Sequence, residues 1–184
     1  MSLKRSLRFA IGAMAAAVTL ITTPVLARQA APAPAGDVKA ALVKDVTNLS
    51  DKFTGLARVM AGKYDWRPGQ GVRSVSEVFN LIVGENNMLA GLLSGPAGGR
   101  GGGMGGAPIT DPAALQAALT SSYAAVNKAL TALSATDLNA SVTLFGQNTT
   151  KQGAVLMLLM DQHEHLGQSI AYARSNSVVP PWSK

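Results

Sequence analysis

Apolar residues recur at steps of three, four and seven along four segments of the chain, which is the spacing of helices that turn one face to a core. Helix-start signals precede three of these segments: Asp37 can cap the first, Ser74 forms a capping box with Glu77, and Asp111 stands before a proline. The expected helices therefore start near residues 37, 74, 111 and 149, and the first and last end near residues 62 and 176. The apolar stripes comprise Val38, Leu42, Leu49, Phe53, Leu56 and Met60; Val78, Leu81, Ile82, Glu85 and Leu89; Leu115, Leu119, Tyr123, Val126, Leu130 and Leu133; and Val155, Leu158, Asp161, His165, Gln168 and Tyr172.

A glycine-rich segment separates the second and third helices. Residues 95–108 read GPAGGRGGGMGGAP, and this composition predicts a long mobile connection that is neither helix nor strand and that contributes little packing. Gly101, Gly103 and Gly106 match the spacing GxGxxG, but no strand pattern precedes them and no GK[ST] follows, so we do not expect nucleotide binding. The pattern as a whole predicts an all-α fold, an up-and-down four-helix bundle with the glycine-rich loop between its second and third helices.

The first 27 residues have the pattern of a secretory signal. Lys4, Arg5 and Arg8 precede an apolar run over residues 9–21, and small residues follow at positions 25–27. We expect a signal peptide at 1–27, a Pro/Ala-rich linker at 28–36 and one domain at 37–184, in a protein that is periplasmic or secreted after cleavage. The alternative is that the apolar run is kept as an N-terminal anchor.

Composition narrows the classes of function. Removing residues 1–27 leaves 13 basic and 10 acidic side chains, a formal charge of +3 in place of +6, with no basic cluster, so nucleic acid is not an expected partner and neither is a membrane. The absence of cysteine excludes thiolate nucleophiles, disulfides and cysteine-ligated metals. Only His163 and His165 are present, so a site of three histidines from one chain is excluded as well.

The candidate chemistry lies on the fourth helix. Asp161 and His165 are four residues apart, so both project from one helical face at a spacing that can hold a divalent metal. Taken alone, this spacing fits a hydrogen-bonded Asp/His pair inside the bundle, or a solvated polar face, better than it fits a metal site. His163 and Glu164 are interpreted as surface residues.

Two blocks of sequence resemble the DinB superfamily of four-helix bundles. The first is KYDWRPGQGVRSVSEV at residues 63–78, which is similar to the loop leading into the family's second helix. The second comprises LFGQ at 144–147, HLGQ at 165–168, YARSN at 172–176 and VPPWS at 179–183. The resemblance extends over residues 37–183, with the blocks in the family's order and separation.

The resemblance implies a divalent metal, often nickel or zinc, held by one histidine of the second helix and an HxxxH pair of the fourth. Carried over by position, these ligands fall on Leu81, Asp161 and His165, so only one histidine is kept and Leu81 cannot coordinate. We therefore expect a degenerate site that binds metal weakly or not at all, unless Glu85, one turn beyond Leu81, takes the third place.

Three functional hypotheses follow. The first is an exported DinB-like domain without a full metal site, whose bundle binds a small molecule or a partner. The second is a metal-dependent hydrolase or thiol transferase that uses the degenerate site, in keeping with the thiol chemistry that the resemblance implies. The third is a homodimer whose exposed helix faces form the useful surface. The sequence does not decide whether the protein is an enzyme, and it names no catalytic residue.

Overall fold

The computed structural model describes residues 35–101 and 107–183. The helices are α1 (Ala35–Val59), the short 3-10 helix η1 (Ala61–Lys63), α2 (Val75–Ser94), α3 (Pro112–Ala132), the short α4 (Ala135–Leu138) and α5 (Lys151–Ser175). The strands are β1 (Arg100–Gly101), β2 (Ser141–Leu144) and β3 (Gln147–Thr150). The predicted signal sequence at 1–27 and most of the predicted linker at 28–36 lie outside the described residues, as do Gly103 and Gly106.

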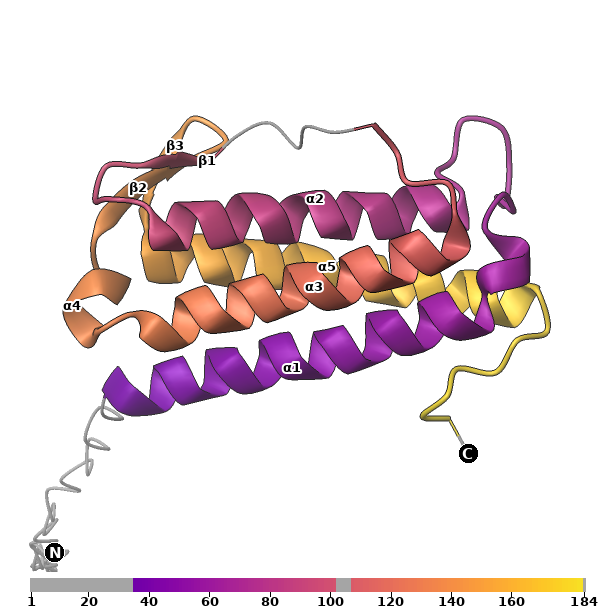
Figure 1. Cartoon of the computed structure of the whole chain (residues 1–184), viewed down its shortest axis with the longest axis horizontal. Coiled ribbons are helices and arrows are strands. Elements are labelled where there is room, and N and C mark those ends of the chain that lie inside the picture. Colours follow the sequence, from indigo (N-terminus) through magenta and orange to yellow (C-terminus); the bar gives the residue numbers. More distant parts are fainter. Residues whose placement is uncertain (1–34, 102–106, 184) are drawn as a thin grey trace, which may run out of the picture. The chain divides into compact units, whose positions relative to one another are not determined.

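The four long helices form the predicted bundle. α1 and α2 each pack against α3 and α5, so they occupy opposite corners (Figure 1). The aromatic centre of the core joins three helices, because Phe53 of α1 stacks on Tyr123 of α3 and meets Phe79 of α2 edge to face. The all-α four-helix fold expected from the apolar stripes is therefore confirmed.

The local signals for helix starts are largely confirmed. Ser74 accepts a hydrogen bond from the Glu77 backbone N–H, and the Glu77 carboxylate accepts one from the Ser74 N–H, which completes the predicted capping box. Asp111 caps α3 through the backbone N–H of Ala114. The first helix differs, since α1 begins at Ala35, two residues before the predicted cap at Asp37.

The directions of two helices depart from the predicted up-and-down order, because α2 and α3 run the same way and α5 therefore runs parallel to α1 (Figure 1). The Asn80 side chain, near the start of α2, exchanges two hydrogen bonds with the backbone of Ile109, just before α3. At the other end, the Lys151 ammonium at the start of α5 donates to the carbonyls of Leu93 and Gly95 at the end of α2. The described residues just before α3 therefore lie at the start of α2, whereas β1 lies against its end, about 30 Å away for a helix of 20 residues (Figure 1).

Part of the glycine-rich segment is ordered against a small sheet, which corrects the prediction that it contains no strand. β1 pairs in parallel with Thr143 and Leu144 of β2, and β2 pairs antiparallel with β3. Gly101 is buried, and a side chain there would meet Leu144 at 3.1 Å and Leu92 at 3.4 Å. The segment therefore packs closely at Gly101, whereas residues 96–98 and Arg100 are exposed. The loop predicted before α5 likewise contains α4 and the hairpin of β2 and β3.

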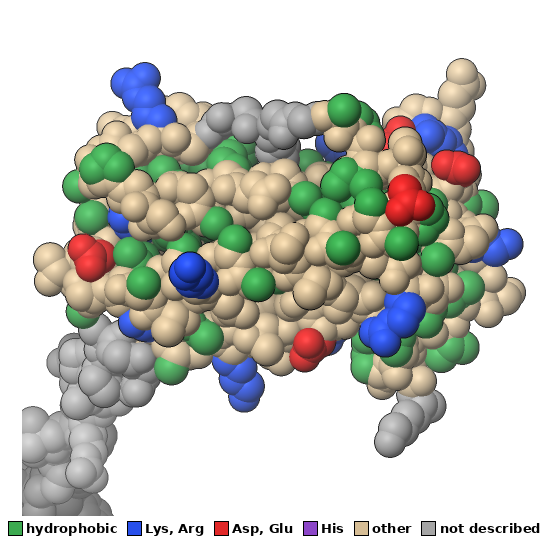
Figure 2. Space-filling model, in the orientation of Figure 1, with side chains coloured by type: hydrophobic (Ala, Val, Ile, Leu, Met, Phe, Trp, Pro, Cys, Tyr) green, Lys and Arg blue, Asp and Glu red, His purple; other side chains and the backbone are tan. Residues whose placement is uncertain are grey.

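The surface is sparsely charged. On the face shown in Figure 2, basic and acidic side chains are few; several of both signs lie near one another at the upper right, and this face shows no concentrated basic patch. Across the described ranges, no helix is long and apolar enough to cross a membrane.

Candidate metal centre

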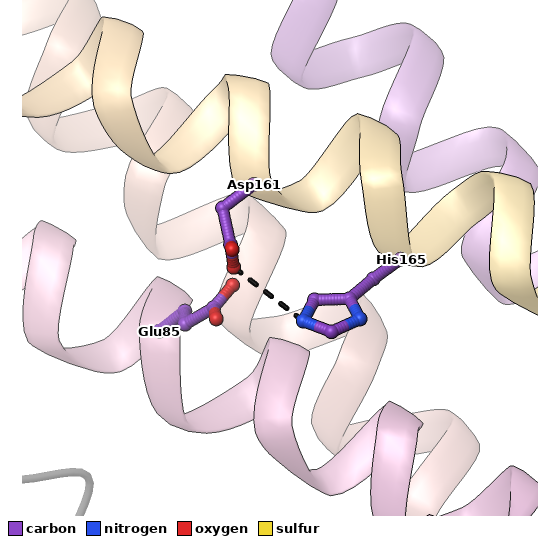
Figure 3. A group of neighbouring side chains, drawn as sticks. All are labelled: Glu85, Asp161 and His165. Atoms are coloured by element: carbon purple, nitrogen blue, oxygen red, sulfur yellow. Dashed lines mark ion pairs between the residues drawn. The ribbon is translucent and has the colours of Figure 1, made fainter.

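Three ligand-type side chains from two neighbouring helices meet between α2 and α5. Glu85 projects from α2, and Asp161 and His165 project from α5, with their carboxylates and imidazole turned toward one another (Figure 3). One ligand atom of each residue lies within 4.8 Å of the ligand atoms of the other two. The spacing of Asp161 and His165 thus places both on one face, as predicted, and Glu85 faces them from the opposite helix.

Glu85 is a buried carboxyl group with too few hydrogen-bond partners to replace the water that it loses on burial. Its side chain is 3% exposed, and its Oε2 atom makes no hydrogen bond with the described residues. Burial, and after it the neighbouring Asp161 carboxylate, raise the pKa of Glu85 from 4.5 to about 8. Hydrogen bonding from Gln162 and the positive charge of Arg73 oppose this rise in pKa. A buried acid with an orphaned oxygen is costly unless a proton or a cation occupies the site.

Asp161 and His165 form the outer part of the group. His165 Nε2 lies 3.6 Å from Asp161 Oδ2, and the side chains are 17% and 45% exposed for His165 and Asp161 respectively. These exposures place Glu85 at the inner end and Asp161 at the solvent side. A cation bound between them would therefore keep room for water or for a small ligand.

A chain of hydrogen bonds fixes the orientation of the His165 ring. The backbone carbonyl of Arg73 can only accept, so the Tyr172 hydroxyl donates to it, at 3.0 Å. The Tyr172 oxygen then accepts from Gln168 Nε2 at 2.8 Å, which leaves Gln168 Oε1 to accept from His165 Nδ1 at 2.9 Å. The proton of a neutral His165 therefore sits on Nδ1, and the lone pair of Nε2 faces Asp161. Two acceptors that face each other are suited to a cation between them.

The other predicted positions lie elsewhere. His163 points away from the group and pairs with Asp45 of α1 at 2.9 Å, with 46% of its side chain exposed, and Glu164 is exposed. Leu81 is half-buried, not part of the core as the predicted stripe implied. It lines a groove on α2 one turn before Glu85.

The sequence analysis missed the buried polar residues next to the ligands. Gln162 and Asn86 are each 1% exposed, and they follow directly after Asp161 and Glu85 in the chain. The inner face of α5 is turned about one residue from the predicted stripe, so Gln162 points into the core and Asp161 lies at its edge. The sequence pattern alone does not reveal this, because the rotation of α5 decides whether Gln162 or Asp161 enters the core.

Metal sites built from side chains on facing helices are a recurrent feature of four-helix bundles. Comparison with known proteins identifies the family to which this bundle belongs. A sequence model described as the DinB superfamily matches residues 27–169. The chain belongs to the DinB superfamily.

Two solved structures have a similar fold. A DinB-like protein from Bacillus cereus aligns with a TM-score of 0.66 and 16% identity, over 79% of this chain and 97% of its own. A DinB-like protein from Bacillus subtilis aligns with a TM-score of 0.64 and 16% identity, over 76% and 93%. At this identity the similarity shows the fold alone. No curated protein matches the chain.

Proposed function

We propose that this chain is an exported DinB-like domain that holds one divalent cation between α2 and α5 and binds a small molecule in a groove on α2. The observation that supports this function best is the buried carboxyl group of Glu85, whose Oε2 makes no hydrogen bond with the described residues and one of whose oxygens lies within 4.8 Å of ligand atoms of Asp161 and His165. A cation would satisfy that oxygen and relieve the repulsion between the two carboxylates. Glu85 thus takes the place that Leu81 cannot fill.

The three residues fit a divalent cation in chemistry and in spacing. Metal–ligand bonds of about 2.0–2.2 Å place ligand atoms about 3–4 Å apart around one ion. The 3.6 Å between His165 and Asp161 is within this range, and the 4.8 Å limit for the whole group needs a closing movement of less than about 1 Å. Two carboxylates and one imidazole should bind nickel or zinc weakly, and should accept a harder ion such as manganese better than a site of three imidazoles would.

A groove on α2 supports the binding of a small molecule; its wall includes Gly84, which precedes Glu85 in the chain, although the three candidate ligands do not line it. The groove has a volume of about 670 Å³, within the usual range for ligand sites, and Leu81, Gly84 and Arg73 contribute to its wall. The positive charge of Arg73 lowers the pKa of Glu85, and the Arg73 guanidinium makes no ion pair with the described residues. A small molecule with an anionic group could pair with the exposed Arg73 in this groove.

Binding is the function that these residues support, because nothing in the described part of the site identifies a substrate bond to break. Hydrolysis and thiol transfer would each require an assigned nucleophile or thiol site. A protein partner or a second copy of the chain on the exposed helix faces stays a prediction.

Export is part of the proposed function and depends on residues 1–27. The order of basic, apolar and small residues in that segment supports it. A fusion of residues 1–40 to a reporter that is active only in the periplasm should be active. A full-length protein found in the cytoplasm with Met1 still in place would contradict export.

Equilibrium titration of metal-free protein tests the cation site. Wild-type protein should bind one equivalent of zinc or nickel, and Glu85→Gln should weaken binding about 10-fold or more, because it replaces a ligand oxygen and removes a charge. Glu164→Gln, an exposed change of the same chemistry on α5, is the matched control and should bind as the wild type does. If the two variants bind metal equally, Glu85 is not a ligand.

A further inference from the structure

A closed ring of buried polar side chains crosses the core next to the metal centre. Ser122 and Tyr123 are neighbours on α3, Asn86 belongs to α2, and Gln162 belongs to α5. Asn86 Nδ2 donates to Ser122 Oγ at 3.2 Å, Gln162 Nε2 donates to Asn86 Oδ1 at 2.9 Å, and the Tyr123 hydroxyl donates to Gln162 Oε1 at 3.0 Å. The ring therefore leaves α3, passes through α2 and α5, and returns to α3.

The direction of every hydrogen bond in the ring follows from one backbone carbonyl. The carbonyl of Leu119 can only accept, so the Ser122 hydroxyl donates to it at 3.0 Å and must itself accept from Asn86. Asn86 Oδ1 is then the acceptor for Gln162 Nε2, and Gln162 Oε1 is left to accept from Tyr123. Each amide consequently has one orientation that satisfies its partners.

A ring of buried polar side chains gives the core no advantage in stability over apolar packing, so we look for a role other than stability. All four side chains are at most 2% exposed, where a polar group is destabilising if it lacks a partner. Apolar side chains of similar volume often serve at least as well for stability. Polar networks in a core instead favour one registry of the packed elements over others.

The position of the ring points to that use. Its only bond between α2 and α5 joins Asn86 to Gln162, and these residues directly follow the candidate ligands Glu85 and Asp161. A shift of α2 along α5 would break the amide bond and separate the ligands together.

We propose that Asn86 and Gln162, held in orientation by Ser122 and Tyr123, are positioning residues that fix Glu85 of α2 opposite Asp161 of α5. This role rests on the proposed cation site. The ring contributes no ligand of its own. It sets the distance and the register between the two helices that supply the ligands, which is the usual task of the groups behind a metal's direct ligands.

Two variants and two measurements test this role. Asn86→Ala removes the bond between the helices. The triple variant Asn86→Leu, Tyr123→Phe and Gln162→Leu replaces the ring by apolar groups and so keeps the core filled. The control is Tyr64→Phe, which removes another buried tyrosine hydroxyl, bonded to the Ala57 carbonyl at 2.9 Å. Each protein is titrated with Co²⁺, whose visible spectrum reports the geometry around the ion.

The second measurement does not depend on metal. Because the chain has no cysteine, spin labels can be placed at Asn87→Cys on α2 and Glu164→Cys on α5, both exposed positions, to measure the distance distribution between the helices. Asn86→Ala and the triple variant should each broaden this distribution, lower Co²⁺ affinity about 10-fold or more and alter the cobalt spectrum. Tyr64→Phe should change none of the three.

The outcomes separate the role of the ring from the proposed function. If the folded triple variant binds Co²⁺ as the wild type does and keeps a narrow distance distribution, the ring is core packing and its positioning role is wrong. If wild-type protein binds no cation, the proposed function fails. In that case the distance distribution still decides whether the ring fixes the two helices.

Discussion

Glu85 of α2 and Asp161 of α5 face each other with two carboxyl groups, and one of these groups is buried. The Asp161 carboxylate contributes to raising the pKa of Glu85 to about 8, after the larger effect of burial. A helical bundle gains nothing in stability from such a pair, because bringing two acids together and removing one from water are both unfavourable. The pair is understandable as part of a site for a cation.

The pH dependence of stability should report the burial of Glu85. Its pKa rises from an ordinary 4.5 to about 8 on folding, so the folded protein binds this proton more tightly than the unfolded chain does. The stabilisation from protonated Glu85 is therefore fully present below about pH 4.5 and is lost as the pH rises through about 8. The loss is on the order of 4 kcal/mol.

Glu85→Gln should abolish the loss of stability at high pH, because an amide keeps the shape of the side chain without ionising. With a chelator present, the free energy of unfolding from urea titrations should fall between pH 5 and 9 for the wild type. For the variant it should fall much less. The control Glu164→Gln should follow the wild type, and equal slopes for wild type and Glu85→Gln would show that Glu85 is not held protonated.

The two histidines offer a comparison within one helix. His165→Ala should weaken zinc and nickel binding about 10-fold to 100-fold, because it removes a ligand that Gln168 holds in the correct tautomer. His163→Ala should leave affinity unchanged, since His163 pairs with Asp45 outside the group. Calorimetric titration of both variants measures this. An equal loss of metal affinity in His165→Ala and His163→Ala would mean that the metal binds to surface histidines.

Leu81→His should add an imidazole one turn before Glu85, at the position where the family resemblance implies a ligand. We expect tighter nickel binding in this variant, and tighter still when Asp161→His is added, because imidazole suits nickel better than a carboxylate does. Leu92→His is not a useful control, since Leu92 is buried. Asn87→His, on the exposed side of α2, is the better one. An unchanged affinity for Leu81→His would mean that Leu81 does not adjoin the centre.

The glycine-rich connection should respond to substitution in its packed part. Gly101→Ala places a Cβ 3.1 Å from Leu144, so it should destabilise the fold by about 1–3 kcal/mol. Gly91→Ala, inside α2, meets no atom within 4 Å and should stabilise the protein by about 0.5–1 kcal/mol. Urea denaturation of both variants gives the two free energies, and a neutral Gly101→Ala would indicate that the Leu144 and Leu92 side chains shift to admit the methyl group.

The helices were predictable because their signals are local. The capping box at Ser74 and the cap at Asp111 satisfy backbone N–H groups within one turn, whatever the rest of the chain does. The parallel direction of α2 and α3 was not predictable in this way. It depends on the path of a connection long enough to return along α2. The three strands were not predictable from the sequence, because segments of two to four residues, many of them polar, show no alternating pattern of apolar and polar positions.

The candidate site was predictable in part. The spacing of Asp161 and His165 indicated a shared face, and Glu85 was named as the substitute ligand because it lies one turn beyond Leu81. The burial of Gln162 and Asn86 could not be read from the stripes, since a turn of α5 by about one residue decides which polar side chain enters the core. Such a turn is set by packing among all four helices.

Anomalous diffraction from crystals grown with one equivalent of zinc or nickel tests the central claim most directly, because it locates the ion without reference to activity. We expect one strong anomalous peak at the metal's absorption edge, within bonding distance of a Glu85 oxygen, an Asp161 oxygen and His165 Nε2. A peak at His163 and Asp45, or no peak between α2 and α5 in crystals shown to contain the metal, would contradict it.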